Sequence, residues 1–337
     1  MANVVLLPGD GIGPEVAAEA RLALELLAPD IEIVERPIGA AAIRSTGSPF
    51  PTETHDACIG AVAVLKGPVG DPEFDGAAVR PEQGLLAMRA ALDTYANLRP
   101  AVAPGVDLLI VRELVGGLYF GASGVRDDGT AFDTCEYHPA QVERVVRRAF
   151  RLAETRRGLL TSVDKANVLE TSRLWRRVVD AVAADHPSVR VEHMLVDNAA
   201  MQLATDAARF DVVVTENMFG DILSDLAAAV TGGLGLAPSA SLSDGGPGIF
   251  EPVHGSAPDI AGRGIANPAA MLRSTALLLE HGLARPDEAR RLAAAVDAAL
   301  AAAPTPDLGG TATTNELGAA VRARLAVDAR AVATYGG

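Results

Sequence analysis

Short apolar runs alternate along the chain with longer stretches in which apolar residues recur every three or four positions. Runs of the first kind are typical of strands buried in a parallel sheet, and stretches of the second kind are typical of helices packed on it. The alternation therefore predicts an α/β fold with a parallel sheet. Strands are expected at 3–7, 31–35, 61–65, 106–111, 159–163, 189–196 and 211–214. Helices are expected at 14–27, 81–89, 139–156, 268–281, 286–302 and 313–325.

One segment breaks this alternation. An apolar stretch at 118–121, a polar turn at 127–129 and a second stretch at 132–137 predict two antiparallel strands joined by a turn. We expect this hairpin to form an arm that is used in dimerisation.

The composition narrows the class of protein. The chain has 337 residues, of which 49% are hydrophobic, and a formal net charge of −14. This length allows one large domain or two ordinary ones, and the acidic balance disfavours nucleic acid and anionic membranes as partners. We expect no signal peptide and no membrane span. Only Cys58 and Cys135 are present, without metal-ligand spacing, so a reducing cytoplasm is expected.

Two carboxylates are placed together by helical spacing. Asp221 and Asp225 follow the run at 211–214 and lie four residues apart, on one face of the expected helix. Like charges at this spacing repel one another, so a cation between them is the economical explanation. Mg2+ or Mn2+ prefers such oxygen ligands and keeps positions open for a substrate. The alternative is a solvated acidic face.

The glycine-rich turn after the first strand is not a dinucleotide-binding loop. Gly9, Gly11 and Gly13 have the spacing G-x-G-x-G, and Glu15 in the first helical turn would oppose a pyrophosphate. Chemistry is expected instead where other strands end, at Lys165 and near residue 197, because α/β sheets bind ligands at the carboxyl ends of their strands.

Basic side chains are candidates for holding an anionic substrate. Arg89, Arg99 and Arg112 are able to clamp carboxylates, although scattered surface arginines are the alternative. Only Lys66 and Lys165 of the 29 basic residues are lysines. A lysine amine can act as a base, which an arginine cannot.

Eight motifs resemble the isocitrate and isopropylmalate dehydrogenase family over nearly the whole chain. They are GDGIGPE at 9–15, GLLAMR at 84–89, NLRP at 97–100, VRELVGGLYFG at 111–121, DKANVL at 164–169, VDNAAMQL at 196–203, ENMFGDILSD at 216–225 and HGSAPDIAGRGIANP at 254–268. The resemblance implies a two-domain α/β fold that is not a Rossmann fold. A cofactor-binding domain would comprise 1–99 and 252–337. A domain at 100–251 would carry the metal and substrate residues and the dimerisation arm.

The resemblance also implies a role for each matching residue. In a homodimer with shared active sites, Lys165 of the partner subunit would be the general base and Tyr119 the acid. Metal ligands would be Asp221, Asp225 and the partner subunit's Asp197, and Asp221 would also face the substrate. The substrate, a small 2-hydroxy dicarboxylic acid, would be bound by Arg89, Arg99, Arg112, Leu85, Leu86 and Val168. NAD would bind along His254, Gly255, Ser256, Ala257, Asp259, Ile260 and Asn267, with Asp259 on the adenosine ribose.

The motifs at 84–89 and 112–119 resemble the isopropylmalate branch of the family, which serves leucine biosynthesis. The implied reaction is the NAD- and Mg2+- or Mn2+-dependent oxidative decarboxylation of (2R,3S)-3-isopropylmalate to 4-methyl-2-oxopentanoate. Lys66 and the short connection from Arg99 to Arg112 depart from that branch, so a sister enzyme acting on another 3-substituted malate, D-malate or tartrate is the alternative. A metal-dependent phosphohydrolase or a catalytically idle binding protein are readings from other classes.

Overall fold

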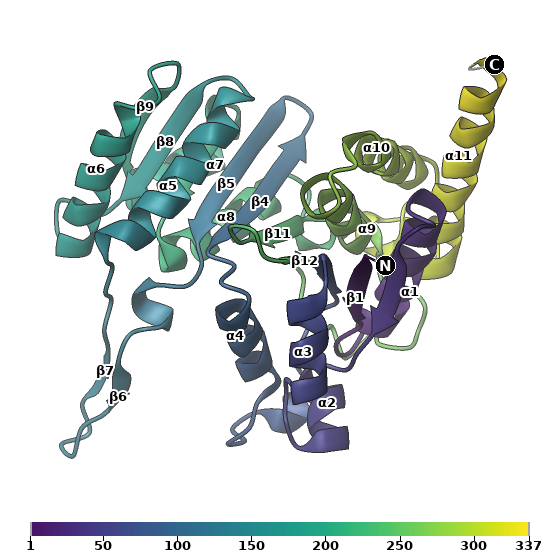
Figure 1. Ribbon diagram of the computed structural model, residues 1–337, viewed down its shortest axis with the longest axis horizontal. Coiled ribbons are helices and arrows are strands. Elements are labelled where there is room, and N and C mark those ends of the chain that lie inside the picture. Colours follow the sequence, from purple (N-terminus) through teal and green to yellow (C-terminus); the bar gives the residue numbers. More distant parts are fainter. Residues whose placement is uncertain (1, 336–337) are drawn as a thin grey trace. The chain divides into compact units, whose positions relative to one another are not determined.

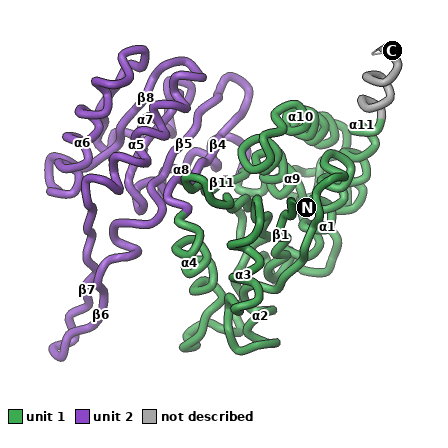
Figure 2. The backbone as a smooth tube through the Cα atoms, in the orientation of Figure 1, with its two compact units in different colours: residues 1–93, 234–337 green, residues 94–233 purple. Residues whose placement is uncertain are grey.

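The computed structural model describes residues 2–335, with side chains through residue 326. The chain forms two compact units, shown in different colours in Figure 2. Unit 1 comprises Met1–Asp93 and Leu234–Gly337, and unit 2 comprises Thr94–Gly233. The mixed α/β architecture predicted from the alternating pattern is present in both units.

Unit 1 contains five strands that pair in the order β2-β1-β3-β12-β11. Their bounds are Asn3–Leu7 (β1), Glu32–Glu35 (β2), Ala63–Lys66 (β3), Pro238–Leu242 (β11) and Gly248–Pro252 (β12). All pairs are parallel except β11 with β12. Its α-helices are Gly13–Leu27 (α1), Gly39–Thr46 (α2), Thr52–Gly60 (α3), Pro81–Ala91 (α4), Ala269–Leu277 (α9), Pro286–Ala302 (α10) and Thr314–Tyr335 (α11). Apolar side chains of β1, β3, β12 and α4 form a core that includes Val5, Val64, Met88 and Ile249.

Unit 2 contains five strands that pair in the order β4-β5-β10-β8-β9. Figure 1 labels β4, β5, β8 and β9. Their bounds are Ala96–Ala103 (β4), Val106–Glu113 (β5), Leu159–Asp164 (β8), Arg190–Leu195 (β9) and Val212–Thr215 (β10). The pair β4 and β5 is antiparallel and the other pairs are parallel. Its α-helices are Pro139–Glu154 (α5), Glu170–Ala183 (α6), Val196–Asp206 (α7) and Asn217–Val230 (α8). Leu108, Val163, Val213 and Leu223 belong to its buried core.

The predicted hairpin is present but shorter than expected. Strands β6 (Ser123–Val125) and β7 (Ala131–Asp133) pair antiparallel and extend from the rest of unit 2 in Figure 1. The expected start of the first strand at 118 is wrong: Gly117–Tyr119 forms a 3-10 turn, and the strand begins at Ser123. Gly117 has φ +72°, a left-handed conformation that glycine adopts readily and that ends the extended backbone.

Three strands were not predicted from the sequence. Strand β4 contains Pro100 and polar residues, which weaken a strand pattern, but its antiparallel pairing with β5 extends from Ala96 to Ala103. Strand β11 reads Pro-Ser-Ala-Ser-Leu, and β12 follows in the same glycine- and serine-rich stretch. In β11, Ser239 and Ser241 are fully buried, so tertiary contacts override their weak strand propensity.

The unit boundaries differ from the predicted domain boundaries at two places. Segment 94–99 lies in unit 2, since β4 pairs along its length with β5. Segment 234–251 lies in unit 1, since β12 pairs with β3. The functional roles predicted for the two domains remain predictions.

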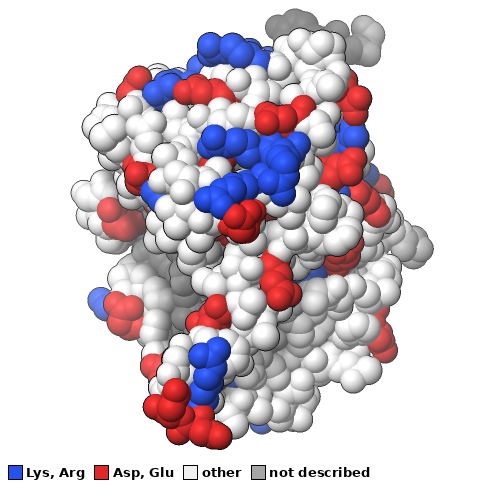
Figure 3. Space-filling view, turned by 90° about the vertical axis from the view of Figure 1, so that its left-hand side faces the viewer, with Lys and Arg blue, Asp and Glu red and all other residues white. Residues whose placement is uncertain are grey.

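Charges of both signs share the surface. On the face seen in Figure 3, Lys and Arg side chains gather in one area and Asp and Glu side chains border them. The net charge of −14 is therefore compatible with locally basic regions. No helix in the part of the chain that the structure describes is long and apolar enough to cross a membrane.

Candidate active site

Helix α8 carries Asp221 and Asp225, the two carboxylates predicted to hold a metal ion. It starts directly after β10, and the Glu216 carboxylate caps it by accepting hydrogen bonds from the backbone N–H groups of Phe219 at 2.7 Å and Met218 at 3.3 Å. Such a cap satisfies donors that have no partner within the helix. Asp221 and Asp225 then follow one turn apart on one face of α8, as the spacing predicts.

Arg112 reaches α8 from the neighbouring strand. Because β5 and β10 are parallel, Arg112 pairs with Thr215 at the edge where α8 begins. Its guanidinium donates to Asp221 Oδ1 and makes two hydrogen bonds to Asn217 Oδ1, at 3.0 and 2.7 Å. A Cβ at Gly220 would lie 2.5 Å from Arg112 Cγ. The glycine in the ENMFGD motif thus lets the arginine stem pack directly on the helix.

Tyr119 meets the same carboxylate from the loop after β5. Its hydroxyl donates to Asp221 Oδ2 at 3.2 Å, and the Arg112 guanidinium carbon lies 5.7 Å from the centre of its ring. Burial and then the charge of Asp221 raise the pKa of Tyr119. The phenol therefore holds its proton at neutral pH, as a proton donor requires.

Asp225 lies next to the Arg99 guanidinium, which does not fully offset the cost of burying the Asp225 charge. The Arg99 guanidinium is 3.7 Å from Asp225 Oδ1, and Arg99 Nε donates to Asn97 Oδ1 at 2.8 Å. Burial raises the pKa of Asp225, Arg99 opposes this rise, and the Asp221 charge adds to it. A cation held by both carboxylates would relieve their repulsion, and their hard oxygens suit Mg2+ or Mn2+.

Lys165 and Asp197 form a second charged pair. Strands β8 and β9 are parallel neighbours, and the two residues follow their carboxyl ends. Lys165 Nζ donates to Asp197 Oδ1 at 2.7 Å, and this hydrogen bond lowers the pKa of Asp197. Asp197 lies in the first turn of α7, and Val168 is 61% exposed.

The described residues include no group of three or more His, Cys, Asp or Glu side chains arranged to hold a metal ion. Among these residues, no hydrogen bond or ion pair joins Lys165 or Asp197 to Asp221 or Asp225. The predicted metal site would take Asp221 and Asp225 from one chain and Asp197 from the partner subunit. That assignment remains a prediction.

In unit 1, Arg89 belongs to a buried ionic cluster. Its Nη2 donates to Glu251 Oε1 at 3.0 Å, and Lys66 Nζ lies 2.7 Å from Glu251 Oε2 and donates to Gly67 O at 2.8 Å. Burial alone would raise the pKa of Glu251, but Lys66 and Arg89 outweigh it and lower that pKa to about 2. Lys66 is only 2% exposed, so its charge is committed to Glu251.

The leucines beside Arg89 differ in their surroundings. Leu85 packs partly against the core of unit 1, whereas Leu86 is 38% exposed. Both lie within one helical turn of Arg89 on α4, so an apolar and a cationic group share one helix face.

The predicted cofactor segment packs on the first turn of the chain. The Ser256 backbone oxygen accepts from Ile12 N–H at 2.8 Å, and a Cβ at Gly11 would lie 2.0 Å from it. Gly255 has open space around it, since a Cβ there would meet nothing within 4 Å. Ala257 has φ +40°, a conformation that L residues rarely adopt. Strain of this kind is concentrated at functional segments.

The exposure and hydrogen-bond partners of side chains in the segment 254–267 indicate which of them could contact a cofactor. Burial lowers the pKa of His254, and its buried Nε2 has no hydrogen-bond partner within the described residues. Asp259 and Gly255 are exposed, and Ile260 is half-buried. Asn267 is buried, with its amide donating to Asp307 at 3.0 Å and its oxygen accepting from Ala269 N–H. The open backbone at Gly255 and the orphaned imidazole nitrogen fit a dinucleotide, while Asn267 already has partners on both sides.

Four residues of these clusters were missed from the sequence. Glu216 and Asn217 open the ENMFGD motif, and a carboxylate before an apolar helix is a cap signal. Tyr137 Oη donates to Glu113 Oε2 at 3.2 Å and accepts from Asn217 N–H at 3.1 Å, but Glu113 and Tyr137 are 24 residues apart in the chain and no local pattern connects them. A cavity of about 690 Å3 in unit 2 is lined by Gly116, Gly117, Tyr137 and ten other residues. Neither Tyr119 nor Asp221 lines it.

The chain is similar in sequence to known proteins along nearly its whole length. The family model described as isocitrate/isopropylmalate dehydrogenase matches residues 3–321. The chain belongs to the isocitrate/isopropylmalate dehydrogenase family. The 3-isopropylmalate dehydrogenase of Deinococcus radiodurans is 51% identical, over 95% of this chain and 97% of that protein. That of Streptococcus pneumoniae is 48% identical, over 96% and 99%.

Solved structures agree with this membership of the isocitrate/isopropylmalate dehydrogenase family. The isocitrate dehydrogenase from Methylococcus capsulatus superposes with a TM-score of 0.90 at 36% identity, covering 96% of this chain and 99% of that one. A β-decarboxylating dehydrogenase from Thermococcus kodakarensis has a TM-score of 0.85 at 37% identity, with 96% of each chain covered. The predicted fold class is thereby confirmed.

Proposed function

We propose that the protein is an NAD- and Mg2+- or Mn2+-dependent 3-isopropylmalate dehydrogenase of leucine biosynthesis that acts as a cytoplasmic homodimer. The observation that carries the proposal is the convergence of Arg112 and Tyr119 on Asp221, with Asp225 one helical turn away. It joins a guanidinium, a protonated phenol and two carboxylates that would hold the metal in one unit. The relatives named 3-isopropylmalate dehydrogenase, at about 50% identity, support the substrate.

The residues have separate tasks in this reaction. Arg89, Arg99 and Arg112 would hold the substrate carboxylates, and Asp221 and Asp225, with Asp197 of the partner subunit, would hold the metal. A bound metal supplies Lewis-acid stabilisation of negative charge on an oxygen, and NAD accepts a hydride. The Lys165 amine would take the proton of the C2 hydroxyl. The Tyr119 phenol, which keeps its proton, would donate to C3 after CO2 has left.

The pairing of Lys165 with Asp197 supports the proposal that both residues of one subunit contribute to the same active site. They are held together at 2.7 Å, so a subunit that presents one presents the other. Lys165 would therefore act in the site of the partner, where Asp197 completes the metal ligands. This arrangement requires the dimer, and the β6–β7 hairpin is the element proposed to support it.

The apolar surface of α4 supports an alkyl substituent at C3. Leu86 is exposed beside Arg89, and burying an isopropyl group against such a side chain contributes about 0.8 kcal/mol per carbon. Lys66 is 2% exposed, and its ammonium is held by both Glu251 and Gly67 O, whereas Arg89 is 9% exposed and its larger guanidinium carries five N–H donors. Lys66 is therefore less suited than Arg89 to bind a further carboxylate. Isocitrate is accordingly expected to be a poor substrate.

The cofactor preference follows from charge. Asp259 is exposed in the segment proposed to bind the adenosine, where a carboxylate accepts hydrogen bonds from ribose hydroxyls and repels the 2′-phosphate of NADP. The neutral His254 imidazole and the open backbone at Gly255 support the same segment as the binding loop.

The test is to follow NADH formation by pure protein with NAD, Mg2+ and each of 3-isopropylmalate, D-malate, tartrate and isocitrate. We expect the highest kcat/KM with 3-isopropylmalate. Isocitrate or tartrate in first place would refute the substrate assignment, while no turnover with any of them would refute the reaction. Full activity in excess EDTA would refute the metal requirement.

A matched pair of variants tests the alkyl site. Leu86→Ala should lower kcat/KM for 3-isopropylmalate about 10-fold or more, since deleting apolar contacts costs about 1–3 kcal/mol, and should leave D-malate nearly unchanged. Leu26→Ala, at a 54% exposed leucine of α1, is the control that should change neither value. An equal loss for both substrates in Leu86→Ala would show that the leucine supports the fold and does not select the alkyl group.

A further inference from the structure

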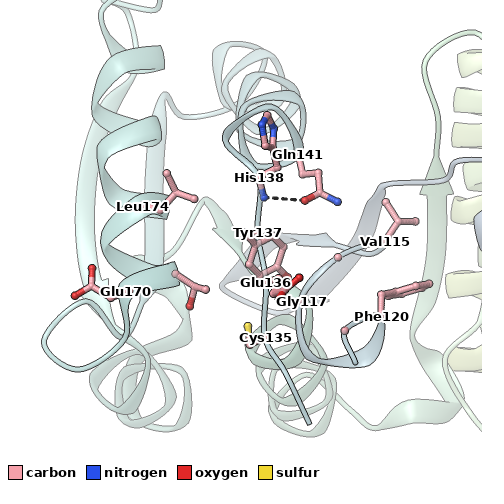
Figure 4. Close-up of a pocket in the computed structure, with 13 residues that line it drawn as sticks. Val115, Gly117, Phe120, Cys135, Glu136, Tyr137, His138, Gln141, Glu170 and Leu174 are labelled. Carbon is pink, nitrogen blue, oxygen red and sulfur yellow. Dashed lines mark hydrogen bonds between the residues drawn. The ribbon is translucent and has the colours of Figure 1, made fainter. Parts of the chain in front are cut away.

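A half-buried tyrosine links the two segments that carry the proposed chemistry in unit 2. Tyr137 follows the hairpin, and its ring packs on the backbone of the loop that leads to Tyr119. A Cβ at Gly116 would lie 2.7 Å from Tyr137 Cε1, and one at Gly117 would lie 2.4 Å from Tyr137 Oη. Figure 4 shows this ring beside Gly117. The two glycines thus admit the phenol at a distance that no other residue type permits.

The hydroxyl of Tyr137 lies between two buried carboxylates. Its Oη is 3.2 Å from Glu113 Oε2 and 3.4 Å from Glu216 Oε2, and it accepts the backbone N–H of Asn217 at 3.1 Å. The phenol has one proton, so it donates to one carboxylate at a time. It therefore contacts the loop side through Glu113 and the helix side through Glu216 and Asn217.

Each carboxylate in turn holds one of the two segments. Glu113 accepts the backbone N–H groups of Val115 at 3.0 Å and Gly116 at 2.9 Å, which shapes the turn before Tyr119. Glu216 caps α8, which carries Asp221 and Asp225. A second contact joins the same two segments, because Asn217 Nδ2 at the start of α8 donates to Gly116 O in the loop at 3.0 Å.

We infer that Tyr137 is a positioning residue whose hydroxyl fixes the start of α8 against the 115–119 loop and so sets where Tyr119 stands relative to Asp221 and Asp225. The inference rests on the proposed function for the roles of these three residues. Tyr137 itself is not among the residues proposed to hold the substrate or the metal. Its effect passes through the loop on one side and the helix cap on the other.

Tyr137→Phe tests this with a minimal change. Phenylalanine keeps the ring contacts with Gly116 and Gly117 and the edge contact with Trp175, whose ring centre is 6.0 Å away. It removes the acceptor of Asn217 N–H and the phenol proton that lies between the two carboxylates. We expect an approximately 10-fold weaker dissociation constant for Mn2+, measured by calorimetric titration with MnCl2, and a 10- to 100-fold lower kcat, because residues that orient metal ligands have effects of about this size.

Tyr95→Phe is the matched control in the same unit. Tyr95 is 1% exposed, and its hydroxyl accepts from Arg148 Nε at 3.0 Å, so this variant also loses a buried phenol hydroxyl. We expect a lower Tm for both variants but parental Mn2+ affinity and kcat for Tyr95→Phe. Equal values for the two variants in both measurements would overturn the inference.

A second variant covers the case in which Tyr137→Phe does not fold. Glu216→Gln keeps Oε1 as acceptor for Phe219 N–H while replacing Oε2, which faces Tyr137 and also accepts from Met218 N–H, and it should weaken Mn2+ binding in the same direction. Parental affinity there would overturn the inference. Measurements on the parent protein separate the two proposals. If the parent binds Mn2+ but oxidises none of the substrates, the proposed reaction is refuted. If the parent is active and Tyr137→Phe has the parental kcat and Mn2+ affinity, only the positioning role is refuted.

Discussion

Replacing Lys66 by methionine should destabilise the protein by about 3 kcal/mol. Lys66, Glu251 and Arg89 are 2%, 5% and 9% exposed, so the Glu251 charge is shielded from water and depends on its two cations. Methionine has similar length and adapts to its surroundings, so the main change is the loss of the ammonium group at 2.7 Å.

The magnitude follows from the two cations around Glu251. They lower its pKa from 4.5 to about 2, and this difference corresponds to about 3 kcal/mol of folding stability. Removing one partner of a buried ion pair costs about 3–5 kcal/mol. Arg89 stays at 3.0 Å from the carboxylate, so we expect the lower end of that range.

The pH dependence has a definite sign. The folded-state pKa of Glu251 is depressed, so its contribution is fully present above about pH 4.5 and is lost as the pH falls towards 2. In Lys66→Met this acid-dependent loss should shrink, because the pKa of Glu251 rises towards its ordinary value. The variant is thus expected to be less stable at pH 7 and less sensitive to acid through this group.

Urea unfolding at pH 7 and at pH 3 measures both effects. Arg290→Met is the control in the same unit, since Arg290 and Asp287 form an exposed pair with side chains 72% and 81% accessible. That change should alter the free energy of unfolding by less than about 0.5 kcal/mol. A loss in Lys66→Met no greater than in the control would refute the reasoning.

Four further outcomes are expected. Lys165→Met should keep the fold and lower kcat about 10²- to 10⁴-fold, because the base is removed, and near-parental kcat would exclude that role. Asp221→Asn should raise the Mg2+ concentration needed for half-maximal activity, and an unchanged requirement would argue against metal ligation. Asp259→Lys should narrow or reverse the preference for NAD over NADP in kcat/KM. An unchanged preference would show that the Asp259 carboxylate does not face the ribose. Burial raises the pKa of Glu113 to about 7, against the hydrogen bonds it accepts from two N–H groups and Tyr137 and the charge of Arg144. Folded Glu113 therefore binds its proton more tightly than the unfolded chain does, and its penalty, absent below about pH 4.5, should grow to about 3 kcal/mol as the pH passes 7. Urea unfolding at pH 5 and 8 should show this decline in the parent and a smaller one in Glu113→Gln, and equal declines would contradict it.

The periodic pattern was sufficient for the elements whose identity is local. The spacing of Asp221 and Asp225 placed both carboxylates on one face of a helix, and α8 has them there. Helix α10 has the predicted bounds, and α1 starts within one residue of the expected position, next to its early proline. Apolar spacing and turn residues act over a few positions, so they can be read without knowing the fold.

The strands that were missed depend on their neighbours. Strand β4 is extended because β5 pairs with it over eight positions, and β11 is buried despite its serines. In each case the pairing partner, and not the residue pattern, stabilises the strand. The segment 118–121 shows the reverse, since its apolar residues suggest a strand but Gly117 turns the backbone.

By itself, the sequence determined which residue types were available for chemistry and, through eight motifs, the family. Only the tertiary structure decided how they are paired. Lys66 was open to several interpretations until β3, β12 and α4 brought it to Glu251 with Arg89. Tyr137 carried no local signal at all, yet it lies between Glu113 and Glu216, 24 and 79 residues away. Such contacts form because burial forces polar groups that are distant in the chain to satisfy one another, and that requirement has no local period from which it could be predicted.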